Sequence, residues 1–179
     1  MPSSAVLIPF DEARHGAEWA RWRELAAPGA PFLGPEFFAV VRPLLDQPLV
    51  RNAFVAEARG DRELVGALPL VLEGDVLHGL VGEHSPAFDY TGSSSGLEAI
   101  WAMLRDDSRW NELVLPMVPA FSLLAARLPA FAERDGCPMV VAEDSSHPYL
   151  RLPGFTAALQ PKFRTNLHRC ERKAGEVTL

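Results

Sequence analysis

The chain has 179 residues, 48% of them hydrophobic, and a formal net charge of −6 at pH 7. This length suits one domain, or one domain plus a fragment of another. The negative charge argues against a nucleic-acid binder that works through bulk charge. The two cysteines, Cys137 and Cys170, show no metal-binding or redox spacing, which favours a reducing, cytoplasmic setting without a disulfide scaffold.

The first 45 residues predict a strand followed by two helices. The apolar run over residues 5–10 is too short for a signal peptide or a membrane span and predicts a first strand. Asp11 is expected to cap an amphipathic helix whose apolar face carries Trp19, Trp22, Leu25 and Ala26. Pro35 suits the first turn of a second helix, which Pro43 is expected to kink or end.

Residues 49–81 predict three consecutive antiparallel strands at the centre of a sheet. Three apolar runs rich in Val and Leu are separated by short polar breaks at 59–62 and 73–75, each with a glycine. This composition is typical of hairpin turns. Pro69 cannot donate a ladder hydrogen bond, so we expect a bulge or a local opening there. A sheet of this kind needs helices on its faces to bury enough apolar surface.

The second half of the chain alternates helices and strands. Helical spacing recurs over residues 97–104 and 121–131, the latter helix ending near Gly136. Strands are expected at 113–118, 138–142 and, as a short one, 149–152. This alternation favours mixed α/β layering.

The tail predicts one amphipathic helix with a basic stripe. Residues 155–174 have helical spacing, and Pro161 either kinks the helix or marks its start. Lys162, Asn166, Arg169 and Lys173 share one face, which could meet phosphates, a membrane surface or an acidic partner. We favour the simpler interpretation, a solvated helix face. The apolar residues of the same helix, Phe155, Phe163 and Leu167, are expected to pack on an apolar surface and to promote self-association.

The order of these elements resembles that of a known family, and so do the amino-acid sequences of several segments. Strand, two helices, three-strand meander and alternating helices and strands is the order of the GNAT acyltransferases. Four segments resemble the BioF2-like and CelD-like acetyltransferases, relatives of the FemAB peptidyltransferases. They are residues 64–70, 110–119, 148–153 and 162–169. The resemblance implies an α/β (α+β mixed sheet) GNAT-like fold, with a central antiparallel meander flanked by helices.

The resemblance also implies a function and a domain organisation. Relatives of this kind carry two GNAT-like halves, so residues 1–153 correspond to the first half and residues 154–179 lead into a missing second half. The whole enzyme would move an acyl group from a coenzyme A or aminoacyl donor to a small-molecule amine or hydroxyl acceptor, in surface-polysaccharide or cell-wall assembly. Acetyl-CoA or another acyl-CoA would serve the longer protein, with none held tightly by this chain. The catalytic residues would lie outside it, and no metal is expected. The alternative is a non-catalytic GNAT-like module that binds a ligand or a protein partner.

One glycine-bearing loop is a candidate cofactor site. Gly92, Ser93, Ser94, Ser95 and Gly96 lie between a predicted strand and a helix, where a GNAT domain holds the pyrophosphate of coenzyme A. The usual Gln/Arg-x-x-Gly-x-Gly/Ala signature is absent, and the nearby carboxylate of Asp89 opposes anion binding. The alternative is structural, because Ser95 and Glu98 have the spacing of a capping box.

The preceding polar segment is a candidate substrate site. His84, Asp89 and Tyr90 belong to a loop that a rigid sheet would hold, and such loops commonly carry binding residues. Their spacing matches no recognised triad or metal motif. The alternative is that they form turns and helix caps.

Overall fold

The structure is a computed structural model that describes residues 3–26, 31–45, 47–61, 63–82, 85–143, 161–162, 165–166 and 169. Residues 1–140 make up one compact unit and residues 141–179 a second one. The domain boundary predicted after residue 153 lies outside the described residues and stays a prediction, as does the short strand at 149–152.

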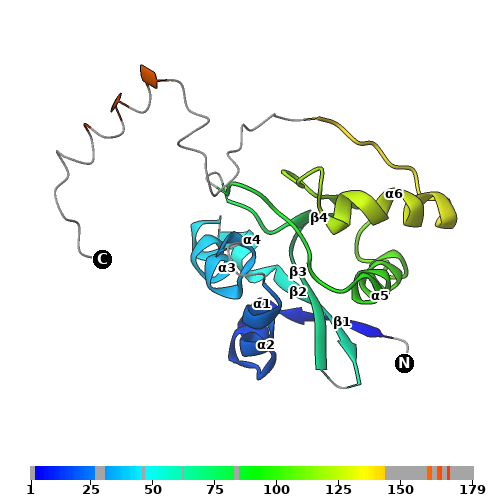
Figure 1. Ribbon diagram of the computed structural model, residues 1–179. Helices are drawn as coiled ribbons and strands as arrows, with labels where there is room; N and C mark the ends of the chain where they lie inside the picture. The colour runs from blue at the N-terminus through cyan, green and yellow to red at the C-terminus, as the bar shows by residue number, and fades with distance from the viewer. Residues whose placement is uncertain are drawn as a thin grey trace. The chain divides into compact units, whose positions relative to one another are not determined.

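The first unit is built on a mixed six-stranded sheet (Figure 1). Its main path runs β1-β2-β3-β4-β6, and β5 pairs with β3 off this path. All pairs are antiparallel except β4 with β6. The strands are β1 (Ser4–Pro9), β2 (Ala53–Gly60), β3 (Glu63–Glu73), β4 (Val76–Gly79), β5 (Thr91–Gly92) and β6 (Glu112–Val114).

Helices cover both faces of this sheet. On β2, Arg59 pairs with Glu18 of α2 at 3.1 Å, whereas the neighbouring Ala58 lies against Gly96 of α5. Because successive side chains of a strand point to opposite faces, α2 and α5 lie on opposite sides. The helices are α1 (Phe10–His15), α2 (Glu18–Leu25), α3 (Pro35–Val41), α4 (Gln47–Arg51), α5 (Ser94–Arg105) and α6 (Leu123–Asp135), with 3-10 turns at Pro31–Leu33 and Arg42–Leu44.

This architecture confirms the predicted fold class. The central strands β2, β3 and β4 form the expected antiparallel meander, and their flanks are helical. The element order runs from a first strand through helices to the meander and then alternates strands with helices. The hairpin breaks also lie where they were predicted, with positive φ at Asp61 and Gly74.

The prediction at Pro69 is confirmed as a local opening. The β2–β3 register runs unbroken through the pair Val55 and Pro69. On its other edge, β3 pairs with β4 only through residues 70–73 and with β5 only through residues 66–67. Pro69 therefore lies where β3 changes partner, which suits a residue without an N–H donor. The bulge in this ladder falls between Ala58 and Arg59 instead.

Three predicted elements near the N-terminus need correction. The meander starts at Ala53, because residues 49–51 belong to α4, whose second residue, Pro48, suits a first helical turn. The expected first helix is two helices, α1 and α2, separated at Gly16. Asp11 lies in the first turn of α1, and Pro9 occupies the cap position. Pro35 does open α3, and a 3-10 turn containing Pro43 follows it, as predicted.

The strand predicted at residues 138–142 is wrong. These residues join no ladder in the part of the chain that the structure describes, and Val140 is 92% exposed. An apolar run favours a strand only where a neighbouring strand is available to pair with it. The strand predicted at 113–118 is shorter than expected, since β6 spans Glu112–Val114. The helices predicted at 97–104 and 121–131 are confirmed as α5 and α6. The prediction that Phe121 belongs to the second helix is wrong, because α6 starts at Leu123 and Phe121 is 95% exposed.

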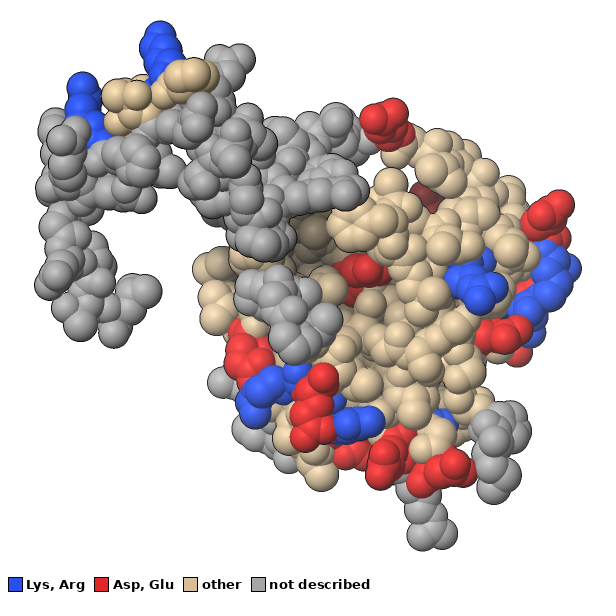
Figure 2. All heavy atoms as spheres, viewed as in Figure 1, with Lys and Arg blue, Asp and Glu red and all other residues tan. Residues whose placement is uncertain are grey.

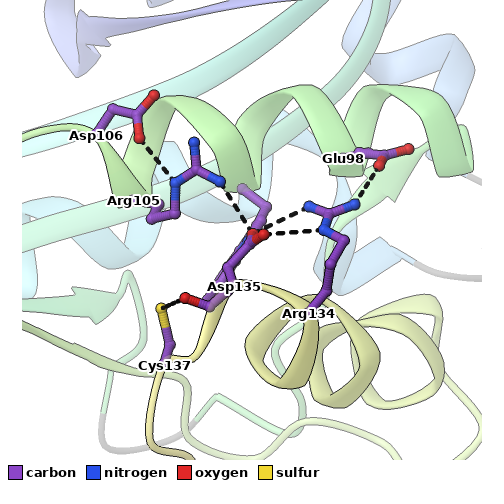
Figure 3. Close-up of polar contacts among 7 residues, drawn as sticks. Glu98, Arg105, Asp106, Arg134, Asp135 and Cys137 are labelled. Atoms are coloured by element: carbon purple, nitrogen blue, oxygen red, sulfur yellow. Dashed lines mark hydrogen bonds and ion pairs between the residues drawn. The ribbon is translucent and has the colours of Figure 1, made fainter.

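Ion pairs join α6 to α5 on the outside of the unit (Figure 3). Asp135 accepts hydrogen bonds from Trp101 at 2.7 Å and from Arg134 at 3.0 Å, and it pairs with Arg105 at 3.1 Å. Arg134 also reaches Glu98 of α5 at 2.6 Å. Arg134 and Trp101 hold the pKa of the Asp135 carboxyl well below its usual range, with help from Arg105.

Burial of Leu68 predicts the effect of a charge at the centre of the sheet. Leu68 is 2% exposed on β3, so Leu68→Asp should unfold the unit, because burying an unpaired carboxylate costs several kcal/mol, on the order of a domain's whole stability. Circular dichroism during thermal unfolding measures this. Val40→Asp, at a position that is 64% exposed, is the control and should melt like the wild type. A Leu68→Asp variant with an unchanged melting temperature would show that position 68 is not buried.

The low pKa of Asp135 predicts a pH-dependent loss on Asp135→Asn. A carboxyl whose folded pKa is depressed stabilises the fold above its unfolded pKa and loses that effect as pH falls through the folded pKa. Asp135→Asn should therefore melt earlier than the wild type at pH 7, and the difference should shrink as pH drops below about 4. Melting curves across pH test this, with the exposed Asp106→Asn as a milder control. An equal difference at every pH would mean that charge plays no part.

Candidate functional site: the strand-end crevice

The only parallel strand pair among the described residues marks where a ligand would be sought. Residues 76–78 of β4 pair with residues 112–114 of β6, and the parallel ladder ends at the pair His78 and Val114. In open α/β sheets, ligands bind in the crevice outside the carboxyl ends of the strands. We call the space beyond Gly79 of β4 and Val114 of β6 the strand-end crevice.

The ring of Phe88 fills the strand-end crevice on the side of β4. Phe88 is completely buried, and a methyl group on Gly79 would lie 2.8 Å from one of its ring atoms. Leu80, the residue after Gly79, is also completely buried. The Phe88 amide donates to the carbonyl of Met117 at 3.2 Å, which links this loop to the loop that follows β6. The crevice is therefore closed by the protein's own side chains.

The backbone at this junction is strained. Met117 has φ 56° and is one of two non-glycine residues with positive φ in the described ranges. Side-chain-bearing residues rarely adopt this conformation, and it persists where surrounding contacts require it. The contact here is the hydrogen bond from Phe88 to the Met117 carbonyl.

Asp89 points to the start of α6. Its carboxylate accepts a hydrogen bond from the amide of Tyr90 at 2.8 Å. Burial raises the pKa of Asp89, whereas hydrogen bonds from Tyr90, from the Ser122 hydroxyl and from the Leu124 amide oppose that rise. A carboxylate at a helix N-terminus is stabilised by the helix dipole. Asp89 therefore lies next to the start of α6, whose cap residue is Ser122.

The Tyr90 side chain packs closely against three glycines. A methyl group on Gly66 would lie 1.7 Å from the Tyr90 hydroxyl, and one on Gly92 or Gly96 within 2.6 Å of it. The hydroxyl donates to the carbonyl of Ser93 at 2.9 Å. Tyr90 is 4% exposed, and burial raises the pKa of its phenol. The described geometry therefore supports a structural role for Tyr90.

The glycine-bearing loop uses its amides within the protein. The Ser93 amide donates to the carbonyl of Val65 at 2.9 Å, and the Leu97 amide to the carbonyl of Ser93 at 3.0 Å. The Gly96 amide donates to the Ser93 hydroxyl oxygen at 3.1 Å. An anion cradle works through amides that point outward to the ligand, so three of the donors in this turn are already engaged.

The predicted capping box is wrong. The cap of α5 is Ser93, and the hydroxyl of Ser95 lies 3.2 Å from that of Ser93. Glu98 pairs with Arg134 of α6 instead of reaching back to the start of α5. The loop is a helix cap, as the structural interpretation held, but with a different serine. A coenzyme contact by Ser94 or Ser95 stays a prediction.

Other predicted site residues are placed only in part. His84 lies outside the described residues. The remaining members of the proposed substrate set, Asp89 and Tyr90, are adjacent in sequence but bond to different helices, α6 and the start of α5. No group of three His, Cys, Asp or Glu side chains with metal-binding geometry occurs in the ranges that the structure covers.

A buried carboxylate on β2 is a polar feature that the sequence analysis missed. Glu57 is 3% exposed. It pairs with Arg59 at 2.8 Å, and Arg59 also reaches Glu18 of α2. Burial raises the pKa of Glu57, and Arg59 opposes that rise. The available signal was the pair Glu57 and Arg59, two residues apart in an apolar strand and therefore on one face.

The tail is described only at a few positions. Lys162, Asn166 and Arg169 each have a helical backbone and an exposed side chain. These exposures agree with a solvated basic face. Lys173 and the apolar residues Phe155, Phe163 and Leu167 lie outside the described residues, so self-association through them stays a prediction.

The described surface mixes charges of both signs. Figure 2 shows acidic and basic side chains side by side along the rim of the first unit, with a broad, mostly uncharged area between them. Within the described ranges, no helix combines the length and the apolar character that crossing a membrane requires.

Among known proteins, similarity to this chain is found in structure and not in sequence. No protein-family model matches the chain, and no curated protein matches it. A ribosomal-protein-alanine N-acetyltransferase from Brucella melitensis biovar Abortus 2308 has a similar structure, with 17% sequence identity and a TM-score of 0.39. The comparison covers 85% of this chain and 100% of that chain. The fold assignment rests on the strand order described above.

The contacts of Tyr90 separate its structural role from a substrate role. Tyr90→Phe removes the hydrogen bond to the Ser93 carbonyl and should lower the free energy of unfolding by about 1 kcal/mol. Urea denaturation measures this. Ser94→Ala is the control, because its side chain makes none of these contacts in the described structure. A Tyr90→Phe variant as stable as the wild type would favour a role for the hydroxyl outside the fold.

Proposed function

We propose that the chain is the N-terminal, GNAT-like half of an acyltransferase. The longer enzyme moves an acyl group from a coenzyme A or aminoacyl donor to an amine or hydroxyl acceptor, in surface-polysaccharide or cell-wall assembly. The observation that carries this proposal is the order of the sheet, an antiparallel meander whose last strand, β4, pairs in parallel with β6. The resemblance of residues 64–70 and 110–119 to BioF2-like and FemAB-related sequences supports the assignment to that group of acyltransferases.

The closed strand-end crevice supports the division into two halves. An acyl donor needs an open site, yet Phe88 fills the crevice beyond β4. The Gly92–Gly96 loop, the other candidate, has two of its amide donors, those of Ser93 and Gly96, engaged within the protein. The donor site and the catalytic groups then belong to the second half of the longer protein, and residues 1–153 support it as a scaffold.

The second candidate function is a non-catalytic binding module. The filled strand-end crevice also favours this function, because a sheet closed in this way needs no acyl donor to fold or to bind a partner. The two functions differ in what the longer protein does, since only the acyltransferase would consume acyl-CoA.

Titration with acetyl-CoA tests the division directly. Isothermal titration of the 179-residue chain should give no binding at a dissociation constant of about 10 μM or tighter, which corresponds to about 7 kcal/mol. The longer gene product that contains these residues should release free thiol from acetyl-CoA, or from an aminoacyl donor, when amine or hydroxyl acceptors are supplied.

Each outcome points to one interpretation. Tight binding by the 179-residue chain would place the donor site in this half, and Gly96→Glu should then abolish it. A longer protein that binds neither donor would contradict the acyltransferase and leave the binding module.

A further inference from the structure

A continuous apolar surface lies on the outer side of α3 and of the 3-10 turn that follows it. Phe32 packs edge-on against Phe37, with ring centroids 5.3 Å apart. Phe37, Val40 and Leu44 follow one another at intervals of three and four residues, and residues so spaced are neighbours on a helix surface. Phe32 is 45%, Val40 64% and Leu44 76% exposed. We call these four residues the α3 patch, and exposed apolar clusters of this kind mark surfaces that a partner covers.

The tail of the chain has the complementary pattern. Four apolar residues recur at every fourth position of its sequence: Phe155, Leu159, Phe163 and Leu167. The described tail positions Lys162, Asn166 and Arg169 have a helical backbone. A helix with this spacing presents one apolar stripe, and amphipathic helices bind apolar surfaces through anchors spaced in this way.

The distribution of charge favours the same pairing. Residues 1–140 hold 11 Lys and Arg against 19 Asp and Glu, a net charge of −8, whereas residues 155–174 hold five against one, a net charge of +4. Glu36 lies beside the α3 patch, one helical turn before Val40, and is half-exposed. Opposite charges around an apolar contact steer the two surfaces together. Two acidic units that met patch to patch would repel each other instead.

We propose that the α3 patch is the docking surface for the tail helix of a second copy of the chain. Phe32, Val40 and Leu44 are exposed in the single chain, so their cover comes from another molecule. Two copies that exchange tails in this way close a dimer, since each copy has one patch and one tail. The proposal does not depend on acyl transfer.

A mixture of two variants tests this pairing. Val40→Asp places a charge in the α3 patch and Phe163→Asp places one in the tail stripe, and an unpaired charge in an apolar contact is costly. Sedimentation velocity over a concentration series should show that the wild type self-associates. Each variant alone should have a dissociation constant raised at least about tenfold. An equimolar mixture of the two should recover part of the association, because it joins an intact patch to an intact tail.

The matched control is Phe121→Asp, which replaces an exposed aromatic ring outside the α3 patch and should associate like the wild type. Phe121 is 95% exposed and precedes α6, which packs Phe131 on Trp101 of α5. The patch belongs instead to the side of α2, because Phe38 of α3 stacks on Trp22 with ring centroids 5.7 Å apart.

Any of four results would overturn the proposal. They are a wild type that stays monomeric, a Val40→Asp that associates like the wild type, a Phe121→Asp that loses as much, and a mixture that recovers nothing. Circular dichroism confirms that each variant is folded. If Val40→Asp does not fold, Leu44→Asp changes a still more exposed position of the patch and is judged by the same criteria.

Discussion

Close contact between two aromatic rings and four glycines is the constraint on which this unit depends. Phe88 lies against Gly79, and Tyr90 lies among Gly66, Gly92 and Gly96. Any side chain at these glycines would overlap a ring or its hydroxyl, at distances that no packed atoms adopt. The rings therefore join β3, β4 and β5 into one surface, and the chain between β4 and β5 has to follow the path that places them there.

The same packing decides what the candidate residues can do. A phenol with a raised pKa that donates to a backbone carbonyl is a poor acid or base near neutral pH. Asp89 is committed to the start of α6 in a similar way. Asp89 and Tyr90, the described members of the predicted substrate site, thus hold the sheet to its helices. Acid–base chemistry needs groups that such contacts leave free.

A buried charged group connects the sheet to α2 on the face of the sheet that this helix covers. Glu57 keeps its carboxylate next to Arg59, which also binds Glu18, so one arginine connects β2 to α2. Removing one member of such a group leaves the other charge without its partner, which is costly in proportion to its burial. In the α5–α6 network, Arg134 is more exposed than Arg59 and Asp135 is more exposed than Glu57, so salt screens that network more strongly.

The sequence predicted the elements whose signal is local. Glycine-bearing breaks at residues 59–62 and 73–75 located the meander, and Pro35 located the start of α3. Residues 138–142 carried an equally good strand pattern, but pairing depends on an available neighbour, which no local pattern encodes. Leu49 to Arg51 was assigned to a strand for the same reason, since a short apolar run fits either a strand or a helix.

The candidate site was harder to predict than the fold, because it depends on contacts between distant residues. The serines at residues 93–95 indicated a helix cap. Ser93 is the residue that caps α5, and its amide is held by the carbonyl of Val65 on β3, a contact that the local sequence does not encode. Nothing near Phe88 in the sequence indicated that its ring would meet Gly79. Burial of Glu57 likewise follows from the helices packed over β2, not from its own strand.

The central claim is that Phe88 occupies the strand-end crevice, and proximity in solution tests it most directly. Nuclear Overhauser contacts between the Phe88 ring protons and the α protons of Gly79 should be strong, because ring atoms and backbone are in van der Waals contact. The amide of Phe88 should also exchange slowly with solvent, since it is bonded to the Met117 carbonyl. Absence of these contacts, with rapid exchange at Phe88, would show an open crevice and contradict the account.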